Sequence, residues 1–555
     1  MTSWQDISAL KCSERDSLIP PAWRLPSHYL STKMTNVMDV ARRCGILTPA
    51  ELAITELSAP ALVNRMLSRN LSSVAVVTAF CKRAAVAQQL TNCLTEIMFT
   101  QAIATAEAID AEYAKTGRAR GALHGLPISL KDNIDVPGFD SSTGFIANVG
   151  DKAFSDAELV RVLRAEGAVF HCKTNVPTGM ILGETYNNVW GLTTNPHNTQ
   201  YACGGSSGGE GVLLALRGSP LGVGSDIAGS IRLPSAACGI YGLKPSTHRI
   251  SMMGMRAGAG PGQESIRPVT GPMSADLASL ELMARVAVGK GGEHDHLMVP
   301  MRWREVTLPT KLCFGLVLDD GVVRPTPAVA RVLLETKAAL EAAGHNVVVW
   351  TPPNVSDGIK LLFRLMQGDS GAAFRATMVG GANPEPWPRG LEYVEKTYQR
   401  TKDRPTPVSA QWKLNIERTA YLSNLLSAWD ETRKVSGTGR PFDGLISPVT
   451  AFPACPHYTF AYTGYCCLWN LADFSAVSFP AGNVKRADVK SEMLSGGFRN
   501  ADEKSIWDHY DVQQLAGMPV GLQVVTSRYT EEKAIKLATV IDKAIGVNSR
   551  ASSKL

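Results

Sequence analysis

The chain has 555 residues, of which 45% are hydrophobic and 19% charged, so it can form a substantial core and is too weakly charged for a disordered chain. Its 56 basic and 50 acidic residues leave a net charge of +6 without a dense basic block, which argues against nucleic acid as a partner. No run of 18 apolar residues and no secretory pattern at the start occur, so we expect a soluble intracellular protein that makes no use of a membrane.

The eleven cysteines are scattered and odd in number, and no CxxC pair occurs among them. This pattern predicts neither a disulfide framework nor a zinc knuckle. His294 and His296 flank an aspartate in a polar stretch, but two imidazoles without a third ligand are a weak metal signal. We therefore expect a loop there, and no metal or cofactor in the protein.

The N-terminal part is predicted to be an irregular arm followed by helices. Prolines break the first 30 residues, and Thr48-Pro49 places a capping residue before a proline at the first helical position. Apolar residues at helical spacing continue to about residue 115, and residues 91–115 contain few helix breakers. We assign residues 1–70 to this arm with its helices.

From residue 127 onward, short apolar strands alternate with helices. The first strand, residues 127–132, is followed by a helix at 157–166, a strand at 168–173, a helix opening at 207–216 and a strand at 221–225. Such alternation predicts an α/β fold with a mixed, largely parallel central sheet and helices on both faces. Later strands are expected at residues 312–318, 346–350, 444–447 and 521–525.

One main domain is expected to extend over residues 71–545. Within it, residues 357–435 are helical, aromatic-bearing and interrupted by prolines, and we interpret them as an insertion that covers one end of the sheet. A flexible tail at 546–555 ends in Ser-Lys-Leu, the signal read by the peroxisomal import receptor. The expected location is therefore the peroxisome, with the cytoplasm as the alternative.

Three segments carry chemistry. The first is Lys131 at the end of an apolar strand. By itself this position favours a lysine that extends into water, whereas burial would lower the pKa of its ammonium group and make it usable as a base. The second is CGGSSGGEG at residues 203–211, whose glycines permit positive φ or close backbone approach. The third is GSDIAGSIRLP at residues 224–234, a turn whose successive N–H groups could converge on a developing oxyanion.

The second segment has an alternative interpretation. Residues 204–208 match G-x-S-x-G, the nucleophile elbow of α/β-hydrolases, which would make Ser206 the nucleophile of an esterase. That chemistry needs an acid and a histidine further along the chain. Asp443 with His457 or His509 could serve, but no local pattern marks them.

Taken together, PISLKDN, CGGSSGGEG and GSDIAGSIRLPSAACGIYGLKPS resemble the amidase signature family, within it most closely the fungal acetamidases and general amidases. Ser206 lies 75 residues after Lys131, and Ser230 lies 24 residues after Ser206. The resemblance extends over nearly the whole chain and implies the amidase signature fold. It also implies a Ser–cis-Ser–Lys triad with no cofactor.

The resemblance assigns roles to individual residues. Ser230 would be the nucleophile, and Ser206, after a cis peptide bond, would bridge it to an uncharged Lys131 that takes and returns the proton. Met180 would line the acyl channel, and Ser206 would also contact substrate. The implied oxyanion hole consists of the backbone N–H groups of Ile227, Ala228, Gly229 and Ser230. The implied supporting residues are Ser207, Asp226 and Arg232.

The sequence departs from the family in one place, since Ala228 stands where glycine is usual. If this position needs positive φ, alanine costs about 1 kcal/mol, and its methyl group could narrow the acyl side of the pocket. The glycine-rich residues 254–262 could form a lid or a plain surface loop.

We therefore expect an amidase that hydrolyses a small-molecule carboxylic acid amide to the acid and ammonia or an amine through an acyl-enzyme on Ser230. Three alternatives stay open: the glutaminase subunit of a tRNA amidotransferase, an elbow esterase that uses Ser206, and a non-catalytic binding protein of the same fold. The sequence does not indicate an oligomeric state.

Overall fold

The structure is a computed structural model that describes residues 3–30, 34–380, 383–401, 404–490 and 497–546. The C-terminal tripeptide expected to direct import lies outside these residues. Among the described helices, none combines the length and the apolarity needed to span a membrane.

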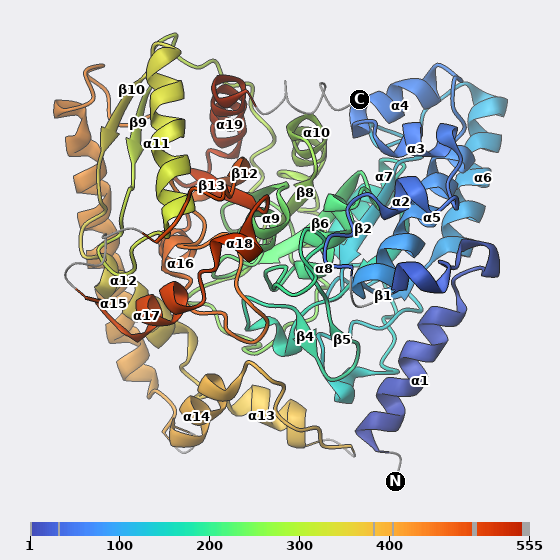
Figure 1. Cartoon of the computed structure of the whole chain (residues 1–555), viewed down its shortest axis with the longest axis horizontal. Helices are drawn as coiled ribbons and strands as arrows, with labels where there is room; N and C mark the ends of the chain where they lie inside the picture. Colours follow the sequence, from blue (N-terminus) through green and yellow to red (C-terminus); the bar gives the residue numbers. More distant parts are fainter. Residues whose placement is uncertain (1–2, 31–33, 381–382, 402–403, 491–496, 547–555) are drawn as a thin grey trace.

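One mixed sheet forms the centre of the molecule (Figure 1). Within the described ranges it has eleven strands, in the order β1-β3-β2-β6-β8-β7-β12-β13-β11-β9-β10. Neighbours are parallel in the groups β3-β2-β6 and β11-β9-β10 and antiparallel elsewhere. The strands are β1 (Leu94–Ile97), β2 (Pro127–Lys131), β3 (Val169–Thr174), β6 (Leu221–Asp226), β7 (Tyr241–Lys244), β8 (Val269–Ser274), β9 (Cys313–Leu316), β10 (Asn346–Val349), β11 (Gly444–Pro448), β12 (Ser475–Asn483) and β13 (Pro519–Thr526), and a separate pair is formed by β4 (Tyr186–Asn187) and β5 (Gly191–Leu192).

Helices lie on both faces of this sheet, as the alternating pattern predicts, and the expected α/β class is confirmed. The α-helices are α1 (Trp4–Ser17), α2 (Val40–Arg43), α3 (Pro49–Thr55), α4 (Ala59–Leu67), α5 (Ser73–Thr91), α6 (Phe99–Thr116), α7 (Glu158–Ala165), α8 (Gly208–Ala215), α9 (Arg232–Cys238), α10 (Leu277–Ala287), α11 (Pro327–Ala342), α12 (Val355–Met366), α13 (Ala372–Val379), α14 (Glu392–Thr401), α15 (Val408–Glu431), α16 (Gly464–Leu471), α17 (Ala501–Asp508), α18 (Val512–Leu515) and α19 (Glu531–Ile545). The 3₁₀ helices are η1 (Pro21–Trp23), η2 (Ser27–Leu30), η3 (Ile146–Asn148), η4 (Thr178–Met180) and η5 (Thr432–Lys434).

The alternation of side chains along β2 determines what faces each layer. Ile128 and Leu130 pack into the apolar cluster formed with α4, α7 and α10. Ser129 and Lys131 point to the opposite face, where α8 packs on β2, β3 and β6. A lysine is thereby buried in the middle of the protein.

The predicted helix over residues 91–115 is wrong in its first part. Asn92 adopts a left-handed conformation and ends α5, and the next residues form β1, which pairs with β3 before α6 begins. The cap at Thr48 is confirmed, since its side chain accepts from the Glu51 N–H at the start of α3.

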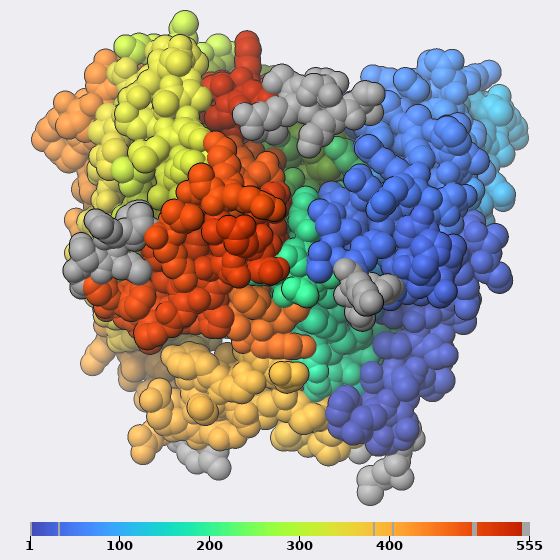
Figure 2. All heavy atoms as spheres, in the orientation of Figure 1, coloured from blue at the N-terminus to red at the C-terminus, as the bar shows by residue number. Residues whose placement is uncertain are grey.

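The stretch expected as a helical insertion contains most of α12 together with α13, α14 and α15. Helix α13 and the N-terminal helix α1 both contact η3, and the two lie close together at one end of the molecule (Figure 1). In the space-filling view, the yellow-orange insertion forms this lower edge beside the dark-blue arm (Figure 2). The expected division of the chain into arm, main domain and tail stays a prediction.

Candidate active site

Lys131 and Ser206, the expected base and bridging serine, are in contact. Lys131 is fully buried at the end of β2, and its Nζ lies 2.7 Å from Ser206 Oγ. The same Nζ lies 2.8 Å from Ser225 Oγ and 3.3 Å from the Ser225 carbonyl oxygen. Among the described residues, no carboxylate forms an ion pair with Lys131, so its polar partners are neutral.

Burial controls the protonation of Lys131. Removal from water lowers the pKa of its ammonium group to about 7, although the negative charges of Asp226, Glu210 and Asp132 act in the opposite direction. A substantial fraction of Lys131 is therefore uncharged near neutral pH and can accept a proton.

The glycine run before α8 allows close backbone packing around Ser206. The peptide bond between Gly205 and Ser206 is cis. A Cβ on Gly205 would lie 2.5 Å from the carbonyl oxygen of Leu182, and Gly204 has a φ of +83° with the Pro234 backbone equally close. Side chains at either position would displace Ser206 from Lys131.

A buried ion pair anchors the turn that carries Ser230. Asp226 ends β6 and Arg232 begins α9, and both side chains are fully buried. Arg232 donates from Nε and Nη2 to the two oxygens of Asp226, each at 3.0 Å. The same carboxylate accepts the N–H groups of Gly229 at 2.8 Å and Ile231 at 3.2 Å, so the residues on either side of Ser230 are held by one group.

This anchor extends to the C-terminal part of the chain. Arg232 also donates to the carbonyl oxygen of Cys466, to Gln523 Oε1 and to Asn470 Oδ1, and Asn470 Nδ2 donates to Asp226 Oδ1. Burial by itself would raise the pKa of Asp226, but Arg232 outweighs it and holds that pKa well below the usual range. Asp226 is therefore ionised near neutral pH.

The four expected oxyanion donors differ in their availability. Gly229 N–H donates to Asp226, whereas the N–H groups of Ile227, Ala228 and Ser230 have no protein acceptor among the described residues. Gly229 has a φ of +118°, and Ala228 is not among the described non-glycine residues with positive φ. The alanine that departs from the family pattern therefore carries no backbone penalty.

Ser230 lies in this turn, and Ser207 connects the turn to the glycine-rich segment. Ser230 is 8% exposed, and within the described chain its hydroxyl makes no hydrogen bond. Ser207 N–H donates to the Ser230 carbonyl oxygen at 3.0 Å, and Ser207 Oγ lies 3.3 Å from both backbone groups of Ser225. The two catalytic segments thus meet through backbone contacts, and the role of each serine stays a prediction.

Met180, the expected channel residue, is the last residue of η4 and is half-buried with a φ of +59°. The candidate lid packs against it, because a Cβ on Gly258 would lie 2.2 Å from the Gly179 carbonyl oxygen and 3.1 Å from Met180 Cε. Residues 254–262 therefore contact the expected substrate channel.

The elbow alternative does not find its partners in the structure. His457 lies 2.6 Å from Glu184, and Asp443 accepts the N–H of Cys313 at the far part of the sheet. His509 is exposed and contacts its own helix α17. None of the three contacts Ser206, whose recorded partner is Lys131.

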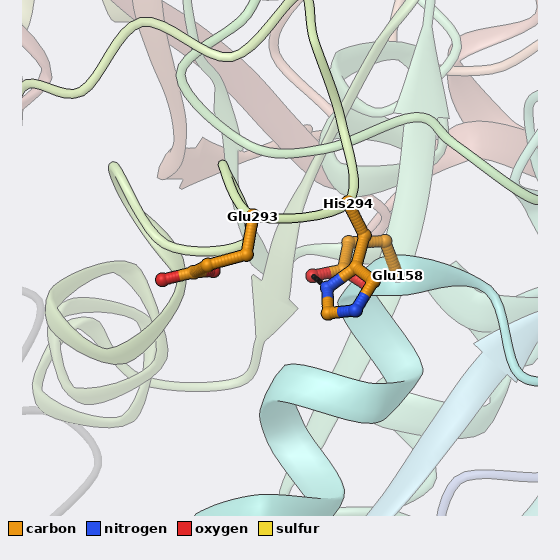
Figure 3. Close-up of side chains that lie close together, drawn as sticks. All are labelled: Glu158, Glu293 and His294. Atoms are coloured by element: carbon orange, nitrogen blue, oxygen red, sulfur yellow. Dashed lines mark ion pairs between the residues drawn. The ribbon is translucent and has the colours of Figure 1, made fainter.

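The polar loop with His294 does not form a convincing metal centre. Glu158, Glu293 and His294 come within ligand distance of one another, as Figure 3 shows. However, Arg161 already binds both oxygens of Glu158 at 2.6 and 2.8 Å. His296 is not part of this group, so the paired imidazoles do not converge on one ion.

Sequence reasoning missed several site residues. Ser225 and Glu210 lie inside the quoted segments, and an acidic side chain in an otherwise glycine- and serine-rich run could have drawn attention to Glu210. Asn470 and Gln523 lie more than 230 residues from Arg232, and no local signal marks them.

Comparisons with known proteins identify the family of the chain. The family profile described as Amidase matches residues 75–535. The chain is 36% identical to an acetamidase of Emericella nidulans over 98% of both chains, and 39% identical to amidase 1 of Gibberella moniliformis over 87% of this chain and 92% of that protein. A solved fatty acid amide hydrolase superposes with a TM-score of 0.91 at 31% identity, covering 98% of this chain and 95% of the other.

The fold and the buried lysine–serine site define a hydrolase that acts on amide bonds. The chain belongs to the amidase signature family, so the expected membership is confirmed.

Proposed function

We propose that this amidase cleaves a carboxylic acid amide through an acyl-enzyme on Ser230, with Ser206 and Lys131 as the proton relay. The observation that carries the proposal is the 2.7 Å contact between Ser206 and a fully buried Lys131, which has no acidic partner at ion-pair distance in the part of the chain that the structure describes. A buried lysine that is partly uncharged and contacts a serine hydroxyl can accept the proton of that hydroxyl.

In the proposed relay, the contact between Lys131 and Ser206 supports the first proton transfer. Lys131 takes the Ser206 proton while Ser206 takes that of Ser230, whose oxygen attacks the amide carbonyl carbon. The negative oxygen that develops is stabilised by the free N–H groups of the 227–230 turn. The relay returns the proton to the leaving nitrogen, the C–N bond breaks, and water then releases the acid by the same route.

Intact-mass spectrometry with a fluorophosphonate tests the nucleophile. The wild-type protein should gain one adduct, and Ser230→Ala should gain none while remaining folded. Hydrolysis of amides should fall by at least about 10⁴-fold in Ser230→Ala and by about 10²–10⁴-fold in Lys131→Met. An adduct that persists in Ser230→Ala but disappears in Ser206→Ala would instead establish the elbow chemistry.

Simple amides are the first substrates to test, because relatives of this chain carry the name acetamidase. Release of ammonia from acetamide by the purified chain alone would exclude an obligate tRNA amidotransferase complex. A folded wild-type protein that is neither labelled nor active would favour the binding protein. Assays with a series of amides of increasing size would then show which size the enzyme prefers.

A further inference from the structure

Glu210 is a fully buried carboxyl group on α8 that the proton relay does not use. Its Oε2 accepts from Ser129 Oγ at 2.7 Å, and its Oε1 accepts from Thr174 Oγ1 at 2.9 Å. Ser129 lies two residues before Lys131 on the same face of β2, and Thr174 is the strand partner of Lys131 on β3. The carboxyl group is therefore held against the buried stem of Lys131, behind the relay.

The sheet is shaped to admit this carboxyl group. Gly222 is the partner of Ser129 on β6, and a Cβ there would lie 2.0 Å from Glu210 Oε2. Any other residue at position 222 would occupy the space of the carboxylate. Residues of three strands and one helix thus surround the Glu210 carboxyl group, at a position where an apolar side chain would be usual.

The surrounding hydroxyls can serve either protonation state of Glu210. Ser129 Oγ also lies 3.4 Å from the Leu221 carbonyl oxygen, and Thr174 Oγ1 lies 3.4 Å from that of Leu130. Each hydroxyl can donate to the carboxylate, or accept from a protonated Glu210 and donate to its carbonyl. The network therefore does not force the group to be charged or neutral, and burial raises its pKa to about 8.

Of the acidic groups that act on Lys131, Glu210 has Lys131 as its one cationic neighbour within the described residues. Asp226 is bound by both arms of Arg232. Asp132 is held by Ser142 and the Thr143 N–H, and it is the strongest opposing charge on Lys173, which belongs to the other face of the sheet.

We propose that Glu210 is a positioning residue that tunes how firmly Lys131 holds its proton, through the negative charge it can carry behind the relay. The inference rests on the proposed function, since it concerns the base of that relay. Besides Lys131, the titratable groups of the described residues that interact with Glu210 are Cys172 on β3 and Cys93 before β1. Both thiols stay neutral because burial raises their pKa values, so the charge of Glu210 acts mainly on Lys131.

The test is a direct titration of Lys131, which does not require the protein to be enzymatically active. Protein carrying ¹³C at lysine Cε is titrated from pH 5 to 10 by NMR, and the Lys131 signal is identified by its loss in Lys131→Met. Glu210→Gln keeps the size and an acceptor but removes the partial negative charge that Glu210 carries near pH 7. The Lys131 midpoint should therefore fall by about 0.3 pH units, a twofold loss of proton affinity. The acidic limb of kcat/KM for amide hydrolysis should move to lower pH by the same amount.

Two further variants keep the test decisive. Asp132→Asn removes a charge elsewhere and should shift the midpoint by less than half as much. Thr174→Val removes one donor to the carboxylate, which disfavours its charged form, so the midpoint should move in the same direction but by less. Thr174→Val also carries the test if Glu210→Gln does not fold.

The outcomes separate the two proposals. A midpoint that is unchanged or raised in Glu210→Gln, or an equal shift in Asp132→Asn, would overturn the role of Glu210. Uniform loss of activity at every pH without a shift would reduce Glu210 to a packing residue and also overturn it. If Ser230→Ala still hydrolysed amides, the proposed function would fail, whereas the measured titration of Lys131 would stand.

Discussion

Replacement of Arg232 by lysine tests whether the buried anchor holds the nucleophile turn. The guanidinium group makes five hydrogen bonds, two to Asp226 and one each to Cys466, Gln523 and Asn470. An ammonium group has three donors and cannot form the planar fork, so at least two buried acceptors lose their partner. At about 1–3 kcal/mol for each unsatisfied group, the loss of two such hydrogen bonds should cost about 2–6 kcal/mol, although the positive charge beside Asp226 is kept.

The assay is urea unfolding followed by tryptophan fluorescence, combined with kcat/KM for an amide. Arg232→Lys should lower the unfolding midpoint strongly and reduce kcat/KM, because the residues on both sides of Ser230 are held by Asp226. Arg164→Lys is the matched control: Arg164 forms the same fork on Asp156 at 2.8 and 2.9 Å, but with 44% of its side chain exposed.

This exposed pair should contribute less than about 1 kcal/mol. Equal destabilisation by Arg232→Lys and Arg164→Lys would refute the reasoning that burial makes the anchor strong. Full activity of Arg232→Lys would refute the link between the anchor and the Ser230 turn.

Gly222→Ala should destabilise the fold by about 1–3 kcal/mol in urea unfolding, because the new methyl group overlaps Glu210 Oε2; an unchanged midpoint would contradict this packing. Burial raises the pKa of Glu385 to about 7. Glu385 therefore stabilises the folded state at low pH, and this contribution is lost as the pH rises from about 4.5 to 7. Glu385→Gln should therefore flatten the pH dependence of the unfolding midpoint over that range, and a parallel curve would be evidence against it. Ala228→Gly should raise kcat/KM for larger acyl groups relative to acetamide by about tenfold; an unchanged ratio would show that the methyl group does not limit the pocket. A fluorescent fusion ahead of residues 553–555 should enter peroxisomes and stay cytoplasmic when these residues are removed.

The sequence predicts part of the sheet. β3, β6, β9, β11 and β13 were expected at or near their observed positions. β7, β8 and β12 were not predicted; they contain glycine or proline, as in VTGPMS and SAVSFPAGN, but so do β6, β9 and β13, so these residues alone do not separate the two groups. Central strands covered on both faces tolerate such residues because packing by neighbouring layers, and not local propensity, holds them in place.

The site could be predicted only where its residues lie in local motifs. Lys131, Ser206 and Asp226 were found because each lies in a segment that departs from ordinary patterning. The contacts of Arg232 with Asn470 and Gln523 depend on how α16 and β13 pack against α9, which no short-range pattern encodes. Likewise, the contacts of the glutamate inside CGGSSGGEG depend on how β2, β3 and β6 surround it, which the motif alone does not show.

The distance along the chain between Arg232 and Gln523 has a consequence for biosynthesis. These two hydrogen-bonded residues are 291 positions apart. At a synthesis rate of about 5–20 residues per second, the ribosome needs roughly 15–60 s to make the second after the first. For that interval the nascent polypeptide carries the relay residues but lacks the groups that complete their anchor. The enzyme therefore becomes competent only near the end of its own translation.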